Sequence, residues 1–134
     1  MKGIYVLIIK LSNTVSVEVG ALGKLTFDGG LYAYVGSAQN NLELRVQRHK
    51  RKKKQLFWHI DYLLNDKAAT ITDVLYTLGD KPKECQIASK LAEKSEPIKG
   101  FGCSDCHCTS HLFHAESFQF LKDYMRSLKV KRNQ

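Results

Sequence analysis

The sequence predicts an α+β domain, in which a small mixed or antiparallel sheet is flanked by helices and carries an inserted β-hairpin. Two observations lead to this class. Short segments rich in β-branched and aromatic residues come first, and segments with helical spacing of apolar residues follow later in the chain. The length of 134 residues fits one domain, and neither an internal repeat nor a linker divides it.

Strand patterns dominate the N-terminal part. Residues 3–11 are almost continuously apolar, which suits a strand that is buried on both faces. Residues 15–19 alternate as Val-Ser-Val-Glu-Val, a half-buried strand, and residues 24–27 are expected to pair with them as a hairpin. The turn at residues 28–30 then leads into residues 31–36, a second buried strand.

Helix and strand patterns alternate in the middle of the chain. Asn40 and Asn41 can cap a helix that runs to about Lys53. Residues 56–64 have ambiguous periodicity and favour a short helix, whereas residues 70–78 follow an imperfect strand pattern. The next helix begins at Pro82. Its apolar stripe consists of Ile87, Ala88, Leu91 and Ala92.

The C-terminal part combines a loop with a last helix. Residues 96–108 are rich in Gly, Cys and Ser and are expected to form the loop. An amphipathic helix is predicted from Ser117. Its inward-facing residues are Phe118, Leu121, Met125 and Leu128. We therefore divide the chain into a principal domain, residues 1–116, and a C-terminal helix with a basic tail, residues 117–134, packed on the same domain.

The overall charge is strongly positive. Lys and Arg number 21 against 13 Asp and Glu, a net charge of +8, which attracts polyanions such as nucleic acid but also serves simple solubility. The longest apolar run, residues 4–9, is far shorter than the roughly 20 residues of a membrane span. It also lacks a signal-peptide cleavage site. Four Cys without a secretory signal suggest a reducing compartment, so we expect a cytoplasmic protein without membrane contacts.

The positive charge is concentrated in residues 45–54, which hold seven of the basic residues. Arg45, Arg48 and His49 share one helix face. Cations at a helix end also compensate the helix dipole, but that role needs one or two charges rather than seven. Phosphate binding accounts better for the rest. The expected nucleic-acid contacts are Arg48, Lys50, Arg51, Lys52, Lys53 and Lys54, with DNA preferred over RNA and protein partners undefined.

Two tyrosine-bearing strands carry a family resemblance. Gly3-Ile4-Tyr5 and Tyr34-Val35-Gly36, followed by Arg-x-x-Arg-His at residues 45–49, resemble the GIY-YIG nuclease family. Residues 57–64, Glu84-Cys85 and residues 100–113 look like its DUF123 branch. The resemblance covers residues 3 to about 114, leaves the terminal helix outside, and makes residues 1–116 a nuclease-like domain. Residues 15–30 depart from the short turn that usually joins the two strands.

Glu84 is a candidate metal ligand on independent grounds. It precedes Ile87 and Ala88 by three and four residues, so it projects on the apolar stripe of its helix. An acid on an inward face is costly unless it is paired, hydrogen-bonded or bound to metal. The alternative is a first-turn Glu that the helix dipole favours. The resemblance implies the family's single metal-binding Glu.

The resemblance implies phosphodiester hydrolysis at these positions. Mg²⁺ (or Mn²⁺) would bind Glu84, water and phosphate, and Arg45 would clamp the phosphate. Tyr5 and Tyr34 would position or deprotonate the attacking water, which requires a cation to lower a phenol pKa near ~10. His49 would orient one Tyr or accept its proton. For Tyr32 we expect sheet packing instead.

A second polar pair, His59 and Asp61, lies inside an apolar segment. One interpretation is a structural His–Asp contact, and the other is a role lining the groove near the metal. We assign no chemistry to either residue on this basis.

A cysteine-rich loop offers a competing metal site. Cys103, Cys106, Cys108 and His111 could close a tetrahedral Zn²⁺ site. All four fall within nine residues, without the distant ligand pair that zinc modules usually carry. We therefore favour small buried residues in a hydrogen-bonded loop and expect no Zn²⁺.

Two functions from different classes follow. The first is a metal-dependent endonuclease that hydrolyses DNA, with a structure-specific or damage-related substrate. The alternative is a non-catalytic nucleic-acid-binding module that keeps the fold and the basic face. Metal dependence separates them, because a binder holds DNA equally well in EDTA and never cuts it.

Overall fold

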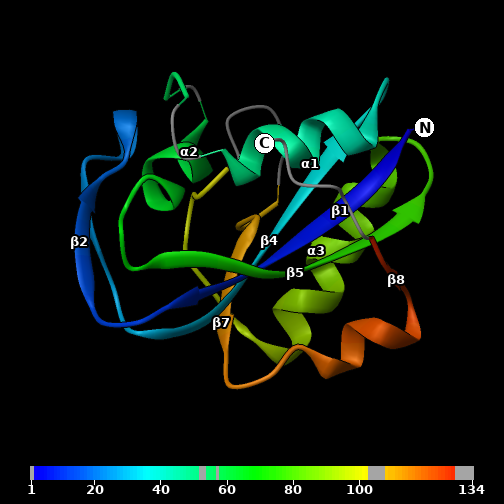
Figure 1. The fold of residues 1–134 in the computed structure, drawn as a ribbon. Coiled ribbons are helices and arrows are strands. Elements are labelled where there is room, and N and C mark those ends of the chain that lie inside the picture. Colours follow the sequence, from blue (N-terminus) through cyan, green and yellow to red (C-terminus); the bar gives the residue numbers. More distant parts are fainter. Residues whose placement is uncertain (1, 52–53, 57, 103–107, 129–134) are drawn as a thin grey trace.

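A six-stranded antiparallel sheet forms the centre of the protein (Figure 1). The computed structural model describes residues 2–51, 54–56, 58–102 and 108–128. In spatial order the strands are β6 (Glu96–Pro97), β7 (Leu112–Ala115), β4 (Gly30–Ala38), β1 (Gly3–Leu11), β5 (Ala69–Leu78) and β8 (Arg126–Ser127). The predicted α+β class is confirmed, and the sheet is antiparallel throughout its described pairs.

Strand β1 lies between β4 and β5 and is buried along nearly its whole length. Its side chains alternate between two hydrophobic cores, as the two-residue period of a strand requires. Tyr5, Leu7 and Ile9 belong to one core, and Ile4 and Val6 belong to the other. This two-sided burial explains why the segment is continuously apolar.

The helices cover both faces of the sheet (Figure 1). Helices α1 (Leu42–Lys50) and α2 (His59–Leu64) contribute to the Tyr5 core, whereas α3 (Pro82–Lys94) contributes to the Ile4 core. Within the described part of the chain, no helix combines the length and apolar character needed to cross a membrane.

The inserted hairpin is confirmed. Strands β2 (Val15–Glu18) and β3 (Lys24–Phe27) pair as a separate two-stranded sheet between β1 and β4 in sequence. The 3-10 turn η1 (Gly20–Leu22) joins them, and Gly20, at φ 47°, faces the Tyr62 ring of α2. The hairpin therefore packs against α2.

Helix starts were predicted more accurately than helix ends. The Asn41 side chain accepts a hydrogen bond from the Leu44 amide at 3.0 Å, and Pro82 occupies the first turn of α3. However, α1 ends at Lys50 rather than near Lys53, because Arg51 already has an extended backbone. On α3 the predicted stripe is buried except for Ala92, which is exposed.

The prediction of one amphipathic helix from Ser117 to the C-terminal segment is wrong. Its residues instead make the 3-10 helix η2 (Gln119–Asp123) and strand β8. The Leu128 amide donates to the Val74 carbonyl at 2.7 Å, so pairing with β5 satisfies backbone groups that a helix would satisfy internally. Of the predicted inward residues, Phe118, Leu121 and Met125 are buried, and Leu128 is half-buried.

The predicted loop over residues 96–108 begins with a strand instead. Its first two residues form β6, which pairs with β7, and β7 in turn pairs with β4. Neither strand was predicted, because two and four residues are too short to establish a pattern. The pairing places His111, just before β7, beside the end of β4, where the Val35 amide donates to its carbonyl at 2.9 Å.

Candidate functional site

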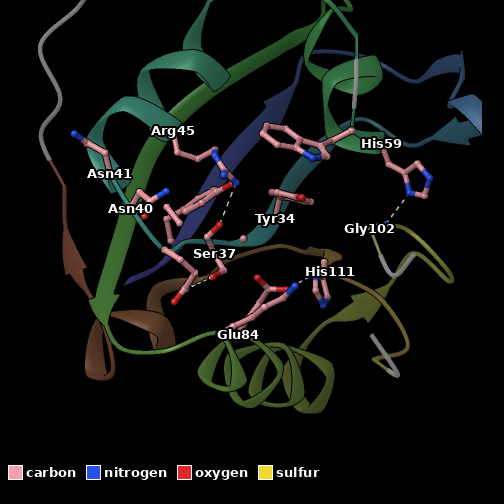
Figure 2. A pocket seen from close by; sticks show the side chains of 15 residues that line it. Tyr34, Ser37, Asn40, Asn41, Arg45, His59, Glu84, Gly102 and His111 are labelled. Atoms are coloured by element: carbon pink, nitrogen blue, oxygen red, sulfur yellow. Dashed lines mark hydrogen bonds and ion pairs between the residues drawn. The ribbon is translucent and has the colours of Figure 1, made fainter. Parts of the chain in front are cut away.

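A cleft of about 560 Å³ opens where β1, β4 and the first turns of the three α-helices meet (Figure 2). It gathers side chains that are far apart in the sequence. Its lining comprises Tyr5, Tyr34, Gly36, Ser37, Ala38, Gln39, Asn40, Asn41, Arg45, Trp58, His59, Lys81, Glu84, Gly102 and His111. Of the predicted site residues, Tyr5, Tyr34, Arg45, His59, Glu84 and His111 therefore lie in one cavity.

Tyr5 and Tyr34 reach this cleft because β1 and β4 are neighbours. In their register Tyr5 lies opposite Gly36, and Leu7 lies opposite Tyr34. A Cβ atom on Gly36 would lie 2.4 Å from the Tyr5 hydroxyl oxygen. Glycine at this position is therefore what leaves room for the Tyr5 ring across the strand pair.

His49 bonds to Tyr5 beneath the cleft. Its Nε2 lies 2.7 Å from the Tyr5 hydroxyl, and the ring lies between Tyr5 and Trp58. Burial, reinforced by the Lys54 ammonium, lowers the pKa of His49 from 6.5 to about 3. The imidazole is therefore neutral at pH 7 and can accept the Tyr5 hydrogen bond. Among the described residues, its buried Nδ1 has no hydrogen-bond partner.

This depressed pKa predicts a specific pH dependence of stability. The unfolded chain takes up a proton at His49 below pH 6.5, whereas the folded chain resists uptake until about pH 3. As the pH is lowered from 6.5 towards 3, the free energy of unfolding should therefore fall by about 1.4 kcal/mol per pH unit from this group alone. Urea unfolding at a series of decreasing pH values measures this loss, and the free energy of unfolding of His49→Gln should decline less steeply than that of the wild type. Parallel declines in both proteins would contradict a buried neutral His49.

Burial raises the pKa of both Tyr5 and Tyr34 above the usual 10. The Arg45 guanidinium acts in the opposite direction on each but does not outweigh burial. Both phenols are therefore protonated at neutral pH. Arg45 lowers the pKa of each tyrosine, as expected for a neighbouring cation, but the pKa of both remains above the usual value because burial has the larger effect.

Arg45 and Arg48 share a helix face, as predicted, but have different partners. Arg45 lines the cleft, donates to the Ser37 carbonyl at 3.1 Å and lies over the Trp58 ring at 4.6 Å. Arg48 lies over the same ring at 4.3 Å and makes a two-pronged ion pair with Asp61, with both distances 3.0 Å. Arg45 therefore lines the cleft, whereas the ion pair of Arg48 with Asp61 connects α1 to α2.

His59 and Asp61 also separate. The His59 Nδ1 accepts from the Gly102 amide at 2.9 Å, and burial lowers the His59 pKa, which favours this neutral acceptor. Asp61 is fully buried and accepts from Arg48 and from the Trp58 amide. His59 thus lines the groove, while Asp61 is structural, and the His–Asp contact that was one of the two interpretations is not formed.

The basic run is divided between structure and exposed surface. Lys54 donates to the His49 carbonyl at 2.7 Å, so it compensates the end of α1. Lys50 and Arg51 are exposed. Lys52 and Lys53 lie outside the described residues. The dipole alternative therefore applies to Lys54, while Lys50 and Arg51 present their charge to solvent.

Glu84 occupies the first turn of α3 and is 7% exposed. Its Oε1 lies 3.2 Å from Nδ1 of His111, and both residues line the cleft (Figure 2). The inward projection inferred from the apolar stripe is confirmed. A buried carboxylate with an imidazole partner avoids the cost of an isolated charge and still faces an open cavity.

The contacts of two cleft residues, His111 and Trp58, were not predicted from the sequence. His111 was considered only as a zinc ligand, and Trp58 only as part of an apolar segment, although it stacks with both α1 arginines. Cys103 and Cys106 of the predicted zinc set lie outside the described residues. Tyr32 packs as expected: it is buried, its hydroxyl donates to the Asp28 carbonyl, and its ring stacks on His114. No local pattern marks the Trp58 contacts, because they arise between separate helices.

Comparison with protein families covers almost the whole chain. The model of the family described as domain of unknown function DUF123 matches residues 4–133. It therefore extends past the resemblance at residues 3–114 and includes the C-terminal segment that pairs with β5. No curated protein and no solved structure matches significantly. The match from β1 to beyond β8 shows that this chain belongs to the DUF123 family.

Proposed function

We propose that this protein is a metal-dependent endonuclease of the GIY-YIG kind that hydrolyses phosphodiester bonds in DNA. The observation that carries the proposal is the convergence of Tyr5, Tyr34, Arg45 and Glu84 on one cleft. These residues come from β1, β4, α1 and α3. Hydroxyls, a planar cation and a single carboxylate are the groups that a phosphodiester and a divalent cation require.

The donor set fits Mg²⁺ or Mn²⁺. Glu84 is the only carboxylate that lines the cleft within the described residues, and Mg²⁺ commonly takes one or two carboxylates and fills its shell with water and phosphate oxygens. The bound ion would neutralise charge that develops on the leaving oxygen. His111 would hold the Glu84 carboxylate in orientation through its Nδ1 contact.

The side chains of the cleft have separable tasks. Arg45 would hold the phosphate with its planar fork, since its stacking on Trp58 already restricts the guanidinium. Tyr5 and Tyr34 would position the attacking water. Burial raises the Tyr5 pKa and lowers that of His49, so proton transfer between them is unfavourable before substrate binds. His49 therefore acts as a positioning residue for Tyr5.

A non-catalytic nucleic-acid-binding module is the second candidate, and one observation favours it. Both cleft tyrosines are neutral, and Glu84 already has an imidazole partner. Such a site could bind phosphate without activating water. We infer a cytoplasmic location for either function, because Cys85 and Cys108 form no disulfide bond, as a reducing compartment favours.

Cleavage of plasmid and branched DNA in Mg²⁺ or Mn²⁺ tests the proposal, with EDTA and Glu84→Ala as comparisons. The nuclease predicts metal-dependent nicking that the variant loses while it still binds DNA. Absence of cutting by either protein, with tight binding that EDTA leaves unchanged, would instead establish the binding module. Duplex DNA, branched DNA and structured RNA should be compared at one salt concentration, because affinity depends strongly on salt.

The exposed cations at the C-terminal end of α1, Lys50 and Arg51, give a further prediction. Neutralising Lys50 and Arg51 with glutamine should reduce the log–log salt slope of duplex binding by roughly 0.9 per lost phosphate contact. Fluorescence anisotropy over a salt series measures that slope. The matched control is Lys122→Gln together with Lys99→Gln, exposed cations on other elements. An unchanged slope in the first pair would remove Lys50 and Arg51 from the interface.

A further inference from the structure

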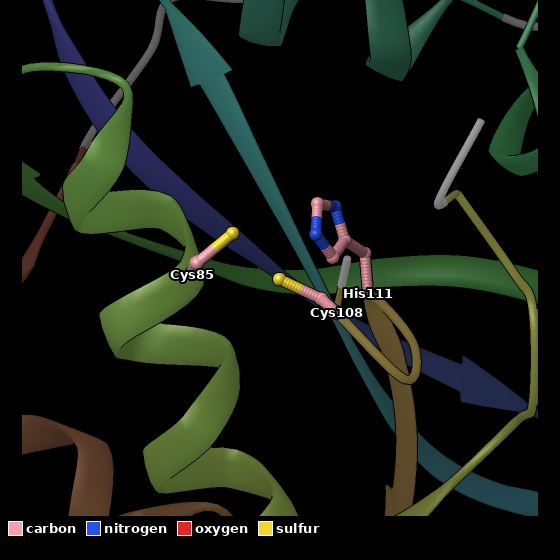
Figure 3. A group of neighbouring side chains, drawn as sticks. All are labelled: Cys85, Cys108 and His111. Carbon is pink, nitrogen blue, oxygen red and sulfur yellow. The ribbon is translucent and has the colours of Figure 1, made fainter. Parts of the chain in front are cut away.

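Three donors of soft-metal type gather behind the Glu84–His111 pair. Cys85 comes from the first turn of α3, Cys108 from the segment before β7, and His111 from the residue just before that strand (Figure 3). Their ligand atoms all lie within 4.8 Å of one another. In Figure 3 the two sulfur atoms point towards one another, and the imidazole lies beside them. Neither cysteine lines the cleft, so the cluster adjoins the proposed phosphate site and shares only His111 with it.

We propose that Cys85, Cys108 and His111 bind a thiophilic divalent metal ion, with Zn²⁺ as the expected occupant. Two thiolates and an imidazole are ligands that zinc prefers, and water would take the fourth tetrahedral position. With metal–sulfur bonds of about 2.3 Å, tetrahedral geometry separates two sulfurs by roughly 3.8 Å. The observed limit of 4.8 Å is about 1 Å larger, which small side-chain rotations can close.

Charge balance supports a metal ion in this place. Both cysteines are half-buried and His111 is buried, so a divalent cation would offset the two negative charges that thiolate ligands bring into this place. A divalent cation with two thiolates and a neutral imidazole has no net charge. Binding would release one proton from each thiol to the solvent, and no change of oxidation state is involved. The chemistry needs no co-reactant.

The Glu84 contact gives the imidazole a defined orientation. With Nδ1 of His111 3.2 Å from the carboxylate, we assign the metal to Nε2. A carboxylate that holds the non-ligating nitrogen of a histidine is a common support of zinc sites. His111 would thus separate two chemically distinct positions, with oxygen ligands for a hard cation on the Glu84 side and sulfur ligands on the other.

This ligand set differs from the one that the sequence suggested. By their spacing, Cys108 and His111 group with Cys103 and Cys106, and that set has no distant ligand. The fold supplies that ligand as Cys85, because α3 packs beside β7. The proposed metal site does not depend on nuclease activity. Cys85 and Cys108 have no part in the proposed hydrolysis, and His111 contributes to it only by its contact with Glu84.

Cobalt titration of the reduced, metal-stripped full chain is the first test. One equivalent of Co²⁺ should produce sulfur-to-cobalt charge-transfer absorption and tetrahedral visible bands, which Zn²⁺ then abolishes. Cys85→Ser should lose these bands and weaken Zn²⁺ binding beyond the roughly 10–100-fold expected for an outer-shell change. The matched control, Cys103→Ser with Cys106→Ser, should bind both metals like the wild type.

Thiol protection provides a second test that requires no variant. Zn²⁺ should shield Cys85 and Cys108 from alkylation and should leave the labelling of Cys103 and Cys106 unchanged, as mass spectrometry of the labelled peptides would report. Shielding of Cys103 with a reactive Cys85 would overturn the proposal in favour of the loop set. It would also be overturned if Cys85→Ser bound Co²⁺ normally, or if the reduced wild type took up no metal and instead formed a Cys85–Cys108 disulfide on oxidation.

Discussion

Replacing Asp61 with alanine is expected to lower the free energy of unfolding by about 3–5 kcal/mol, the usual cost of removing one partner of a buried ion pair. Asp61 is fully buried, and its two oxygens accept from Arg48 and from the Trp58 amide. The substitution would leave a partly buried guanidinium and an amide without their acceptor. Urea unfolding with a fluorescence readout from Trp58 measures the loss.

The matched control for this prediction is Asp80→Ala. Asp80 also forms an ion pair, with Lys2 at 2.8 Å, but both side chains are exposed. Solvent screens such a pair, so we expect little change in stability. A double-mutant cycle that adds Arg48→Met to Asp61→Ala would isolate the pairwise energy. Equal effects of Asp61→Ala and Asp80→Ala would show that the bond between α1 and α2 is not a major contribution.

Replacing Arg45 with lysine is expected to reduce the cleavage rate by about 10²–10³-fold, the range for loss of one well-placed transition-state donor. The positive charge would remain, but the fork that fits a phosphate and the stacking on Trp58 would not. Single-turnover cleavage with saturating enzyme measures this loss apart from binding. The prediction rests on the proposed nuclease function.

Arg51→Lys makes the same chemical change at an exposed position of the same basic run. It should leave the single-turnover rate unchanged. Circular dichroism and thermal unfolding of Arg45→Lys would exclude a folding defect as the cause of lost activity. A rate equal to that of the wild type would remove Arg45 from the reaction and favour a role in packing against Trp58.

The sequence predicted the strongly patterned elements well. Residues 3–11 are apolar at every position but one, and the structure places that strand between two others with a core on each face. The hairpin, the Asn41 cap and the start of α3 at Pro82 were also predicted, because each depends on neighbouring residues. Glu84 was expected to face inward from helical spacing alone, and it does.

The C-terminal segment shows the limit of such patterns. Phe118, Leu121 and Met125 have helical spacing and are buried, yet the backbone forms a 3-10 turn and then extends β5. The spacing of apolar residues determines which side chains turn inward. It does not determine whether the backbone bonds to itself or to the free edge of a sheet.

The pairing of functional side chains was decided only by the tertiary structure. From sequence, Arg45 and Arg48 were both expected to contact phosphate, and Cys108 was grouped with Cys103 and Cys106. In the structure Asp61 pairs with Arg48, and Cys85 approaches Cys108. The sequence by itself determined the α+β class, the positive charge and the candidate residues, because composition and periodicity are local properties. Partner choice and pKa depend on burial and on contacts between distant segments. The expected contact of His49 with a tyrosine is made to Tyr5, but the burial and the lowered pKa of His49 could be learned only from the fold.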